Sequence, residues 1–173
     1  ERLGLRPDIV CIGKVFGGGL PLSACLSSQS VLSAWPENDG EAIHTSTFLG
    51  NPLSCATALA VLDIVEHLDV PERAEVLGSQ LLSELQDSLR GAERVSEVRG
   101  RGLMIGIELV TDDGSPWKGG ALRVAEAALA QGLIILPAGE HGHVVELTPS
   151  AFLTEDQATH SLVVLSSIIQ KIH

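Results

Sequence analysis

The stretch "DIVCIGKVFGGGLPLSACLSS", residues 8–28, places a lysine and three consecutive glycines between two apolar segments. Residues 8–13 form a short apolar run that ends at a glycine, which predicts a buried strand, and residues 22–28 predict a second strand. Lys14 and the glycines at 17–19 therefore lie in a predicted loop between two strands. The backbone of this loop is bare, because glycine has no side chain.

The rest of the chain alternates helical and strand patterns. The predicted elements are a short helix over 30–35, a loop over 36–50, helices over 51–68 and 69–89, a strand, glycine turn and strand over 95–110, a helix over 119–132 closed by Gly132, short strands over 133–137 and 143–147, and a last helix from Thr154. This order predicts an α/β or α+β protein, with a boundary near residues 68–92.

Residues at the predicted helix starts have the chemistry of N-caps. Asn51 can cap the first long helix, whose first turn contains a proline. Asp69 and Glu72 have the spacing of a capping box, and so do Thr154 and Gln157. We therefore expect both the second and the last helix to begin with a capping box.

Composition excludes several classes of function. The net charge is −11 without a lysine or arginine cluster, which argues against nucleic acid or an anionic membrane as partner. No apolar run is long enough to span a bilayer. Cys11, Cys25 and Cys55 stand in apolar surroundings without metal-type spacing. We expect three buried thiols and a cytoplasmic protein, because an odd number of such cysteines suits a reducing compartment.

Lys14 has two interpretations. For an arbitrary Gly-Lys pair the commoner one is a surface cation on a turn. A Walker phosphate loop is excluded, because there the glycines precede the lysine and Ser or Thr follows it, whereas here Val15 follows. The functional interpretation is a Schiff-base lysine, whose partly desolvated amine attacks an aldehyde. The glycines at 17–19 would let a flat cofactor approach.

A second stretch, "HTSTFLGNPLSCATALA" at 44–60, favours the functional interpretation. Ser46 and Thr47 precede a capped helix, and hydroxyls and amides near a helix start can bind phosphate. Alone this signal is weak, since Ser or Thr before a helix usually serves as a cap. One cofactor with both an aldehyde and a phosphate would use both stretches, and that cofactor is pyridoxal 5′-phosphate.

With these motifs the chain resembles the class-III pyridoxal-phosphate-dependent aminotransferases of fold type I. The resemblance is carried by "RPDIVCIGKVFGGGLPLSA" at 6–24, the stretch at 44–60 and "VRGRGLMIGIEL" at 98–109, in the family's order. A weaker match, "ILPAGEHGHVVELTPSAFLTEDQ" at 135–157, extends it over essentially the whole chain. The resemblance implies transfer of an amino group from an amine or amino acid to a 2-oxoacid.

The resemblance also implies residue roles. Lys14 would form the internal aldimine and then move a proton between the substrate α-carbon and the cofactor. Thr47, with the Ser46 backbone, would contact the phosphate of the cofactor in the partner subunit, which implies a homodimer.

The same resemblance implies a division of the chain. Residues 1–68 would be the C-terminal part of the cofactor-binding large domain, residues 69–91 a connecting helix, and residues 92–173 a small C-terminal domain.

Part of the family's machinery has no counterpart in the chain. The phosphate loop, the ring-stacking aromatic and the aspartate that pairs with the pyridine nitrogen would all precede Glu1, and Asp8 does not replace that aspartate. We therefore expect the C-terminal portion of a longer protein, inactive in isolation. A non-catalytic remnant or dimerisation module, and a decarboxylase or aminomutase on the same scaffold, remain alternatives.

Glu146 is a second departure. Many family members have an arginine there that clamps a substrate carboxylate, and Ser150 and Ala151 also differ from the usual residues. A carboxylate would repel an acidic group and favour an amine. Alternatively Glu146 points away from the substrate, because a one-residue slip reverses a strand's faces. His141 and His143 flank a glycine, and that pattern is more often a plain loop than a metal site.

Overall fold

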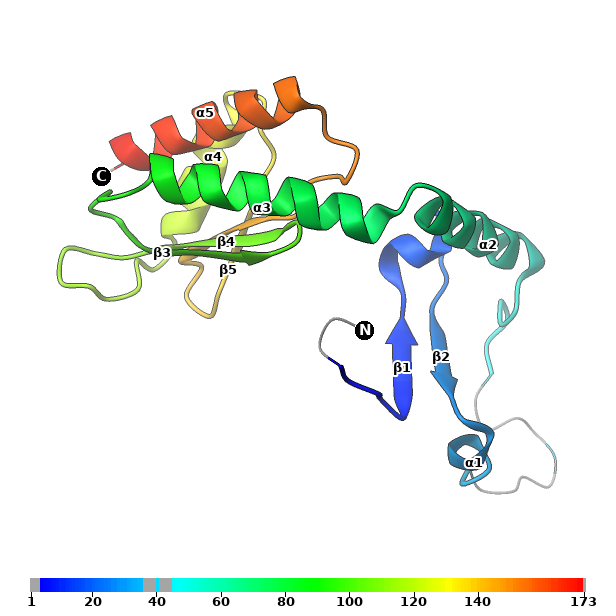
Figure 1. Cartoon of the computed structure of the whole chain (residues 1–173). Helices are drawn as coiled ribbons and strands as arrows, with labels where there is room; N and C mark the ends of the chain where they lie inside the picture. Colours follow the sequence, from blue (N-terminus) through cyan, green and yellow to red (C-terminus); the bar gives the residue numbers. More distant parts are fainter. Residues whose placement is uncertain (1–3, 36–39, 41–44, 173) are drawn as a thin grey trace. The chain divides into compact units, whose positions relative to one another are not determined.

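The structure is a computed structural model that describes residues 4–35, 40 and 45–172. Its elements are β1 (Ile9–Ile12), the 3-10 turn η1 (Lys14–Gly17), β2 (Ala24–Ser27), α1 (Gln29–Leu32), α2 (Pro52–His67), α3 (Val70–Ser88), β3 (Val95–Arg101), β4 (Met104–Leu109), α4 (Gly120–Leu129), β5 (Leu136–Ala138), β6 (Val144–Leu147) and α5 (Glu155–Lys171) (Figure 1). The expected mixed α/β class is confirmed. The predicted loop over 36–50 and the stretch at Glu1 lie partly outside the described residues.

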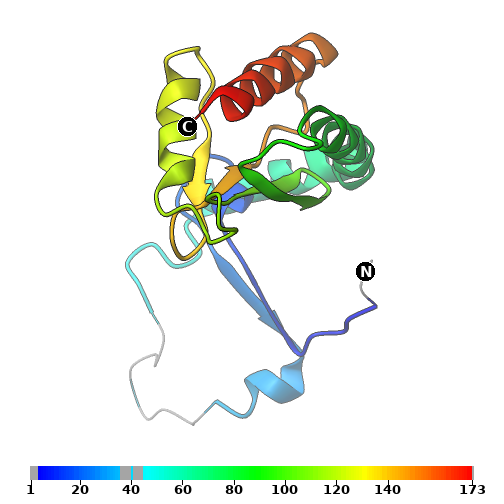
Figure 2. The same cartoon turned by 90° about the vertical axis from the view of Figure 1, so that its left-hand side faces the viewer.

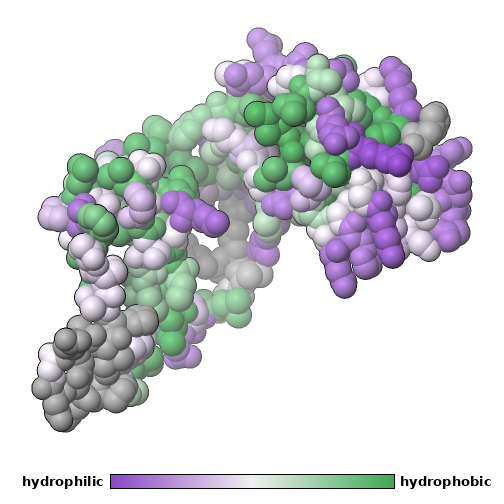
Figure 3. Space-filling model, turned by 180° about the vertical axis from the view of Figure 1, so that it is seen from behind, coloured by the Kyte–Doolittle hydropathy of each residue, from purple (hydrophilic) through white to green (hydrophobic). Residues whose placement is uncertain are grey.

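The chain divides into two compact units, Glu1–Leu68 and Asp69–His173, called unit 1 and unit 2 below. In unit 1, β1 and β2 form a two-stranded antiparallel sheet, so both predicted strands are confirmed. The predicted burial of the first strand is wrong for the described residues, because a two-stranded sheet leaves most of β1 exposed. Apolar side chains are exposed in this unit: Leu53 and Leu59 on α2 are 65% and 63% exposed. Figure 3 shows hydrophobic residues, in green, over the surface of unit 1.

Unit 2 holds a four-stranded antiparallel sheet in the order β3-β4-β6-β5. Helices α3, α4 and α5 all lie on one face of this sheet, as Figures 1 and 2 show from two sides. The core between sheet and helices consists of apolar side chains that are fully buried, namely Ile105, Ile107, Leu109 and Val145 from the strands and Leu85, Val124, Leu165 and Ile169 from the helices. None of the described helices of unit 2 lies on the other face of this sheet.

The helix starts of unit 2 differ from each other. At Thr154 the backbone is extended, the hydroxyl accepts from Gln157 N and the Gln157 side chain accepts from Thr154 N, so the predicted capping box is confirmed. The capping box at Asp69 and Glu72 is wrong. Asp69 has a left-handed backbone, φ 43° and ψ 50°, and its side chain caps no amide. An N-cap side chain reaches the first-turn amides from extended backbone, which Asp69 does not have.

Two other boundaries differ slightly from expectation. The strand predicted over 133–137 is β5, Leu136–Ala138, and begins three residues later than expected. Helix α4 ends at Leu129, and Gly132 lies just beyond it with φ 80°.

None of the described helices combines the length and the apolar character needed to cross a membrane.

Candidate functional site

Lys14 begins η1, two residues after β1 ends at Ile12. Its φ of 59° lies in the left-handed region, and among the described non-glycine residues only Lys14 and Asp69 have positive φ. Such a conformation costs on the order of 1–3 kcal/mol and persists only where surrounding structure enforces it. The turn is closed by Phe16 N donating to Gly13 O at 3.2 Å and Gly18 N donating to Val15 O at 2.9 Å. Strain of this kind is typical of functional positions.

Helix α2 fixes this turn from one side. Thr57 Oγ1 donates to Gly17 O at 2.8 Å, and Gly17 is buried. Gly18 has φ 60°, and a Cβ at Gly18 would lie 3.1 Å from Val61 and 3.2 Å from Thr57. Only glycine satisfies both the left-handed backbone and the close approach of the helix at this position. The glycine-rich sequence therefore serves first to seat the Lys14 turn on α2.

The side of the turn that carries Lys14 is open. The Lys14 side chain is exposed and has no hydrogen bond or ion pair with another described residue. Gly19 has φ 92°, and a Cβ there would meet nothing within 4 Å. Bare backbone beside an accessible amine fits a flat aldehyde cofactor. The described residues do not supply the partial desolvation that we expected around this amine.

Ser46 and Thr47 are exposed and precede α2. Ser46 O accepts from Leu49 N at 3.1 Å, which closes a turn. Among the described residues, no hydrogen bond or ion pair joins either of them to Lys14. No described residue forms a hydrogen bond with either hydroxyl group, and hydroxyl groups of this kind can donate to an oxyanion.

The start of α2 is less available to a phosphate than the sequence suggested. Asn51 Oδ1 accepts from both Leu53 N and Ser54 N at 3.1 Å, which confirms Asn51 as the N-cap. Two of the amides that a phosphate would need at a helix start are thus already satisfied. Phosphate binding here would depend on the hydroxyls and loop amides of Ser46 and Thr47. Asn51 could have indicated this in the sequence, because a side chain that caps a helix competes with an anion for the same backbone amides.

Glu146 lies on the face of the unit 2 sheet that the helices leave uncovered. Strand register places it opposite Gly106 on one side and Leu136 on the other, whereas the next residue, Leu147, pairs with the buried Ile105. Glu146 is half-buried. The register continues from Gly106 to Arg99, so Arg99 and Glu146 stand in one row with one strand between them.

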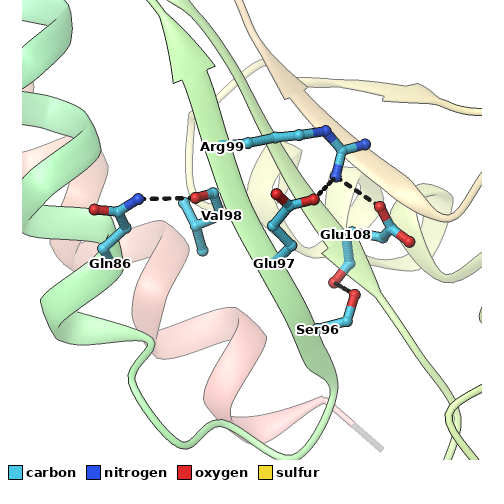
Figure 4. A network of polar contacts seen from close by, with 6 residues as sticks. All are labelled: Gln86, Ser96, Glu97, Val98, Arg99 and Glu108. Carbon is cyan, nitrogen blue, oxygen red and sulfur yellow. Dashed lines mark hydrogen bonds and ion pairs between the residues drawn. The ribbon is translucent and has the colours of Figure 1, made fainter.

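A charged network that the sequence analysis did not single out occupies the same face (Figure 4). Arg99 Nη1 donates to Glu108 Oε2 at 2.6 Å and to Glu97 Oε2 at 2.7 Å. Glu108, and to a lesser extent Glu97, raises the pKa of Arg99 above its ordinary value. Gln86 also joins α3 to β3 by donating to Val98 O at 2.9 Å. The signal was available in β3, where charged residues alternate at 97, 99 and 101, whereas β4 has one charged residue, Glu108.

The cysteines depart from expectation. Cys11 and Cys25 are exposed and Cys55 is half-buried, so the prediction of three buried thiols is wrong. The reason is that β1 and β2 form a two-stranded sheet, which leaves their side chains uncovered among the described residues. All three cysteines are free.

Unit 2 has two further features. The rings of His141 and His143 are 5.8 Å apart, and within the described ranges no group of three or more His, Cys, Asp or Glu side chains is arranged to hold a metal ion. A mostly apolar cavity of about 390 Å³ lies in unit 2, lined by residues of β6 and α5 among others. Lys14, Ser46 and Thr47 do not line this cavity.

Comparison with known proteins assigns the chain to a family. The family model "Aminotransferase class-III" matches residues 1–169. An acetylornithine aminotransferase of Methanothermobacter thermautotrophicus is 34% identical over 169 residues, which cover 98% of this chain and 40% of that protein. A leucine/methionine racemase of Thermococcus litoralis is 34% identical over 164 residues, covering 94% of this chain and 36% of that protein.

A solved structure agrees with these sequence matches. The crystal structure of an amine transaminase from an uncultivated Pseudomonas species, in its PLP-bound internal aldimine form, superposes with a TM-score of 0.85 at 36% identity. The match covers 98% of this chain and 40% of that one. The chain spans about 40% of the length of the acetylornithine aminotransferase. With a family match over nearly its whole length and the fold of a solved transaminase, the chain belongs to the class-III aminotransferase family.

Proposed function

We propose that the protein carrying this chain is a pyridoxal-phosphate-dependent aminotransferase that moves an amino group from an amine or amino acid to a 2-oxoacid. The observation that carries the proposal is the Lys14 turn, where an exposed lysine is held in a left-handed backbone and seated on α2. When bound, the cofactor supplies an aldehyde for covalent attachment and a ring that accepts electrons from the reacting carbon. The class-III family membership supports this class of chemistry.

In this proposal Lys14 has two successive roles. Its Nζ would be the nucleophile that holds the cofactor through the aldehyde. With the substrate bound, the free Nζ would take a proton from the substrate α-carbon and give a proton back. The open space at Gly19 supports the approach of a flat ring beside this amine.

We further propose that Thr47, through its hydroxyl, and Ser46, through its backbone, hold the cofactor phosphate of a partner subunit in a homodimer. The exposure of both residues supports a contact outside the subunit. Because Asn51 already caps α2, these two residues would carry the phosphate contact in place of the helix end. The proposed location is the cytoplasm, which suits three free cysteines.

The proposed domain assignment follows the family. Residues 1–68 would belong to the cofactor-binding large domain, residues 69–91 would connect, and residues 92–173 would form the small C-terminal domain. The packing of α3 against β3 and α5 supports a close association of the connecting helix with the third segment.

Racemisation is a second candidate, because one relative with 34% identity is named a leucine/methionine racemase. It would use the same proton transfer by Lys14 but return the proton to the same carbon. A decarboxylase or aminomutase would also use Lys14. A purely structural dimerisation module is disfavoured, since such a module has no need of a strained lysine beside open backbone.

A half-reaction separates these functions. The full-length polypeptide encoded by the gene, loaded with pyridoxal phosphate, is mixed with an amino donor in the absence of an oxoacid. Transamination predicts conversion of the cofactor to pyridoxamine phosphate and one equivalent of the deaminated donor, an oxoacid from an amino acid or an aldehyde or ketone from an amine. Racemisation of an α-deuterated donor without oxoacid release would contradict it. Lys14→Ala should abolish either reaction, while Lys118→Ala should not.

A further inference from the structure

Cys11 and Cys25 lie directly opposite each other in the antiparallel pair of β1 and β2. Their Sγ atoms are 3.9 Å apart, and both side chains are exposed among the described residues. Facing residues of antiparallel strands have Cα atoms about 4.5–5.5 Å apart, and disulfides join Cα atoms about 4.4–6.8 Å apart. The two strands therefore already hold these cysteines at a separation that a disulfide accepts.

We propose that Cys11 and Cys25 form a redox modification site, a cross-strand dithiol that a small-molecule disulfide converts reversibly into an intramolecular disulfide. The proposal is independent of the proposed function, because it needs neither cofactor nor substrate. It assigns a role to two thiols whose exposure the sequence did not predict.

The reaction is a thiol–disulfide exchange in two steps. The thiolate of one cysteine attacks a sulfur of the small disulfide, forms a mixed disulfide and releases one small thiol, which takes up a proton. The second cysteine then attacks the protein sulfur of the mixed disulfide and releases the other small thiol. The protein pair loses two electrons and two protons, and the small disulfide gains them.

A disulfide between Cys11 and Cys25 would close the segment of chain that contains the Lys14 turn. Residues 12–24, which lie between Cys11 and Cys25, include η1 and the glycines that follow it. The bond would tie together the strand that enters the turn and the strand that leaves it. Contact with Cys11 raises the pKa of the Cys25 thiol, which agrees with two thiols that share one site.

Cys55 provides a matched control. It lies on α2, it is half-buried, and it is not opposite another cysteine in the described sheets. If the small disulfide reacted with each thiol independently, the rate at each of the three cysteines would follow the exposure of that cysteine. A paired site predicts that Cys11 and Cys25 respond together and that Cys55 does not take part.

The test exposes the native full-length protein to oxidised glutathione, followed by alkylation of free thiols and peptide mass mapping. We expect a cross-linked peptide pair joining Cys11 to Cys25, loss of two thiols among these three cysteines, and restoration by a dithiol reductant. Cys55→Ser should leave the cross-link unchanged. In Cys11→Ser, Cys25 should stop at the mixed disulfide with glutathione.

Three results would overturn the proposal. These are stable glutathione adducts on both cysteines without a cross-link, a bond that involves Cys55, and retention of both thiols in the native protein while they react after denaturation. Because the wild-type map alone distinguishes these outcomes, the test does not depend on folding of the serine variants.

Discussion

Thr57 on α2 donates its hydroxyl hydrogen to the carbonyl oxygen of Gly17 at 2.8 Å, which ties the long helix of unit 1 to the turn that begins with Lys14. The same hydroxyl lies 2.9 Å from Ser54 O within the helix. Gly17 is buried, so its carbonyl has little access to water. The bond therefore positions the turn and satisfies a backbone acceptor at once.

Replacing Thr57 by valine should loosen this turn. The change keeps the shape of the side chain but removes one of the two donors to Gly17 O, which still accepts from Leu20 N at 3.1 Å. Loss of one such hydrogen bond typically costs about 0.5–1.5 kcal/mol. We expect a lower unfolding temperature and weaker retention of pyridoxal phosphate on dialysis. Thr57→Ser keeps the hydroxyl and is the control. Equal cofactor retention in Thr57→Val and wild type would show that the bond does not position Lys14.

Gly78 should be intolerant of any side chain. A Cβ at this position of α3 would lie 2.0 Å from Gly102 O, in the turn between β3 and β4. Because the obstacle is backbone, Gly78→Ala must displace the helix from the sheet, at a cost of at least about 1–3 kcal/mol. Chemical denaturation measures the free energy of unfolding of Gly78→Ala and of the control Ser79→Ala, which changes an exposed neighbour on the same helix. Equal stability of the two variants would contradict the close approach.

The turn after β4 should respond to acid through Asp113. Thr111 Oγ1 donates to Asp113 Oδ1 at 2.6 Å and Ser115 N donates to it at 3.0 Å. These bonds, the one from Thr111 foremost, lower the pKa of Asp113 below its ordinary value of 3.8. A lowered pKa in the folded state contributes stability above the ordinary value, and that contribution is lost as the pH falls through the folded-state pKa.

We therefore expect Asp113→Asn to lower the unfolding temperature slightly at pH 7. The gap to wild type should close as the pH falls below 3.8, where the wild-type carboxylate takes up its proton. Thermal unfolding at a series of pH values measures this. A gap that stays constant into acid would mean that the charge on Asp113 contributes nothing.

Glu146 should influence which substrates the proposed enzyme accepts. It is half-buried on the uncovered face of the sheet, near the network of Arg99 with Glu97 and Glu108. If this face meets the substrate, Glu146→Gln removes a charge that repels carboxylates. The change should then raise kcat/KM for an amino donor that carries a second carboxylate by about tenfold, or ~1.4 kcal/mol. Glu108→Gln, on the same face, is the control. If the ratio of kcat/KM for the donor with a second carboxylate to kcat/KM for an uncharged donor does not change, Glu146 lies away from the substrate.

Much of the fold could be predicted because it depends on local signals. Asn51 and Thr154 have cap chemistry that acts within one turn, and both cap as expected. Asp69 has the same spacing of partners but fails, because its left-handed backbone depends on how the chain enters α3. Local patterns identify a cap only where the backbone is free to adopt extended geometry.

The candidate site was less predictable for a similar reason. The sequence indicated Lys14 and its glycines, but not that Lys14 is strained or that Thr57 holds the turn, since the bond from Thr57 to Gly17 spans 40 residues. The pairing of Cys11 with Cys25 required strand register, which a continuous apolar run does not determine because both of its faces look alike. Contacts between distant segments therefore account for most of what sequence reasoning missed.

Covalent trapping with a reductant shows whether Lys14 holds the cofactor. The full-length protein loaded with pyridoxal phosphate is reduced with borohydride and digested, and the labelled peptide is identified by mass. Of the lysines in this chain, Lys14, Lys118 and Lys171, we predict that only Lys14 carries the label and that Lys14→Arg abolishes it. Label on Lys118 or Lys171, or a loaded protein in which none of the three is labelled, would contradict the claim.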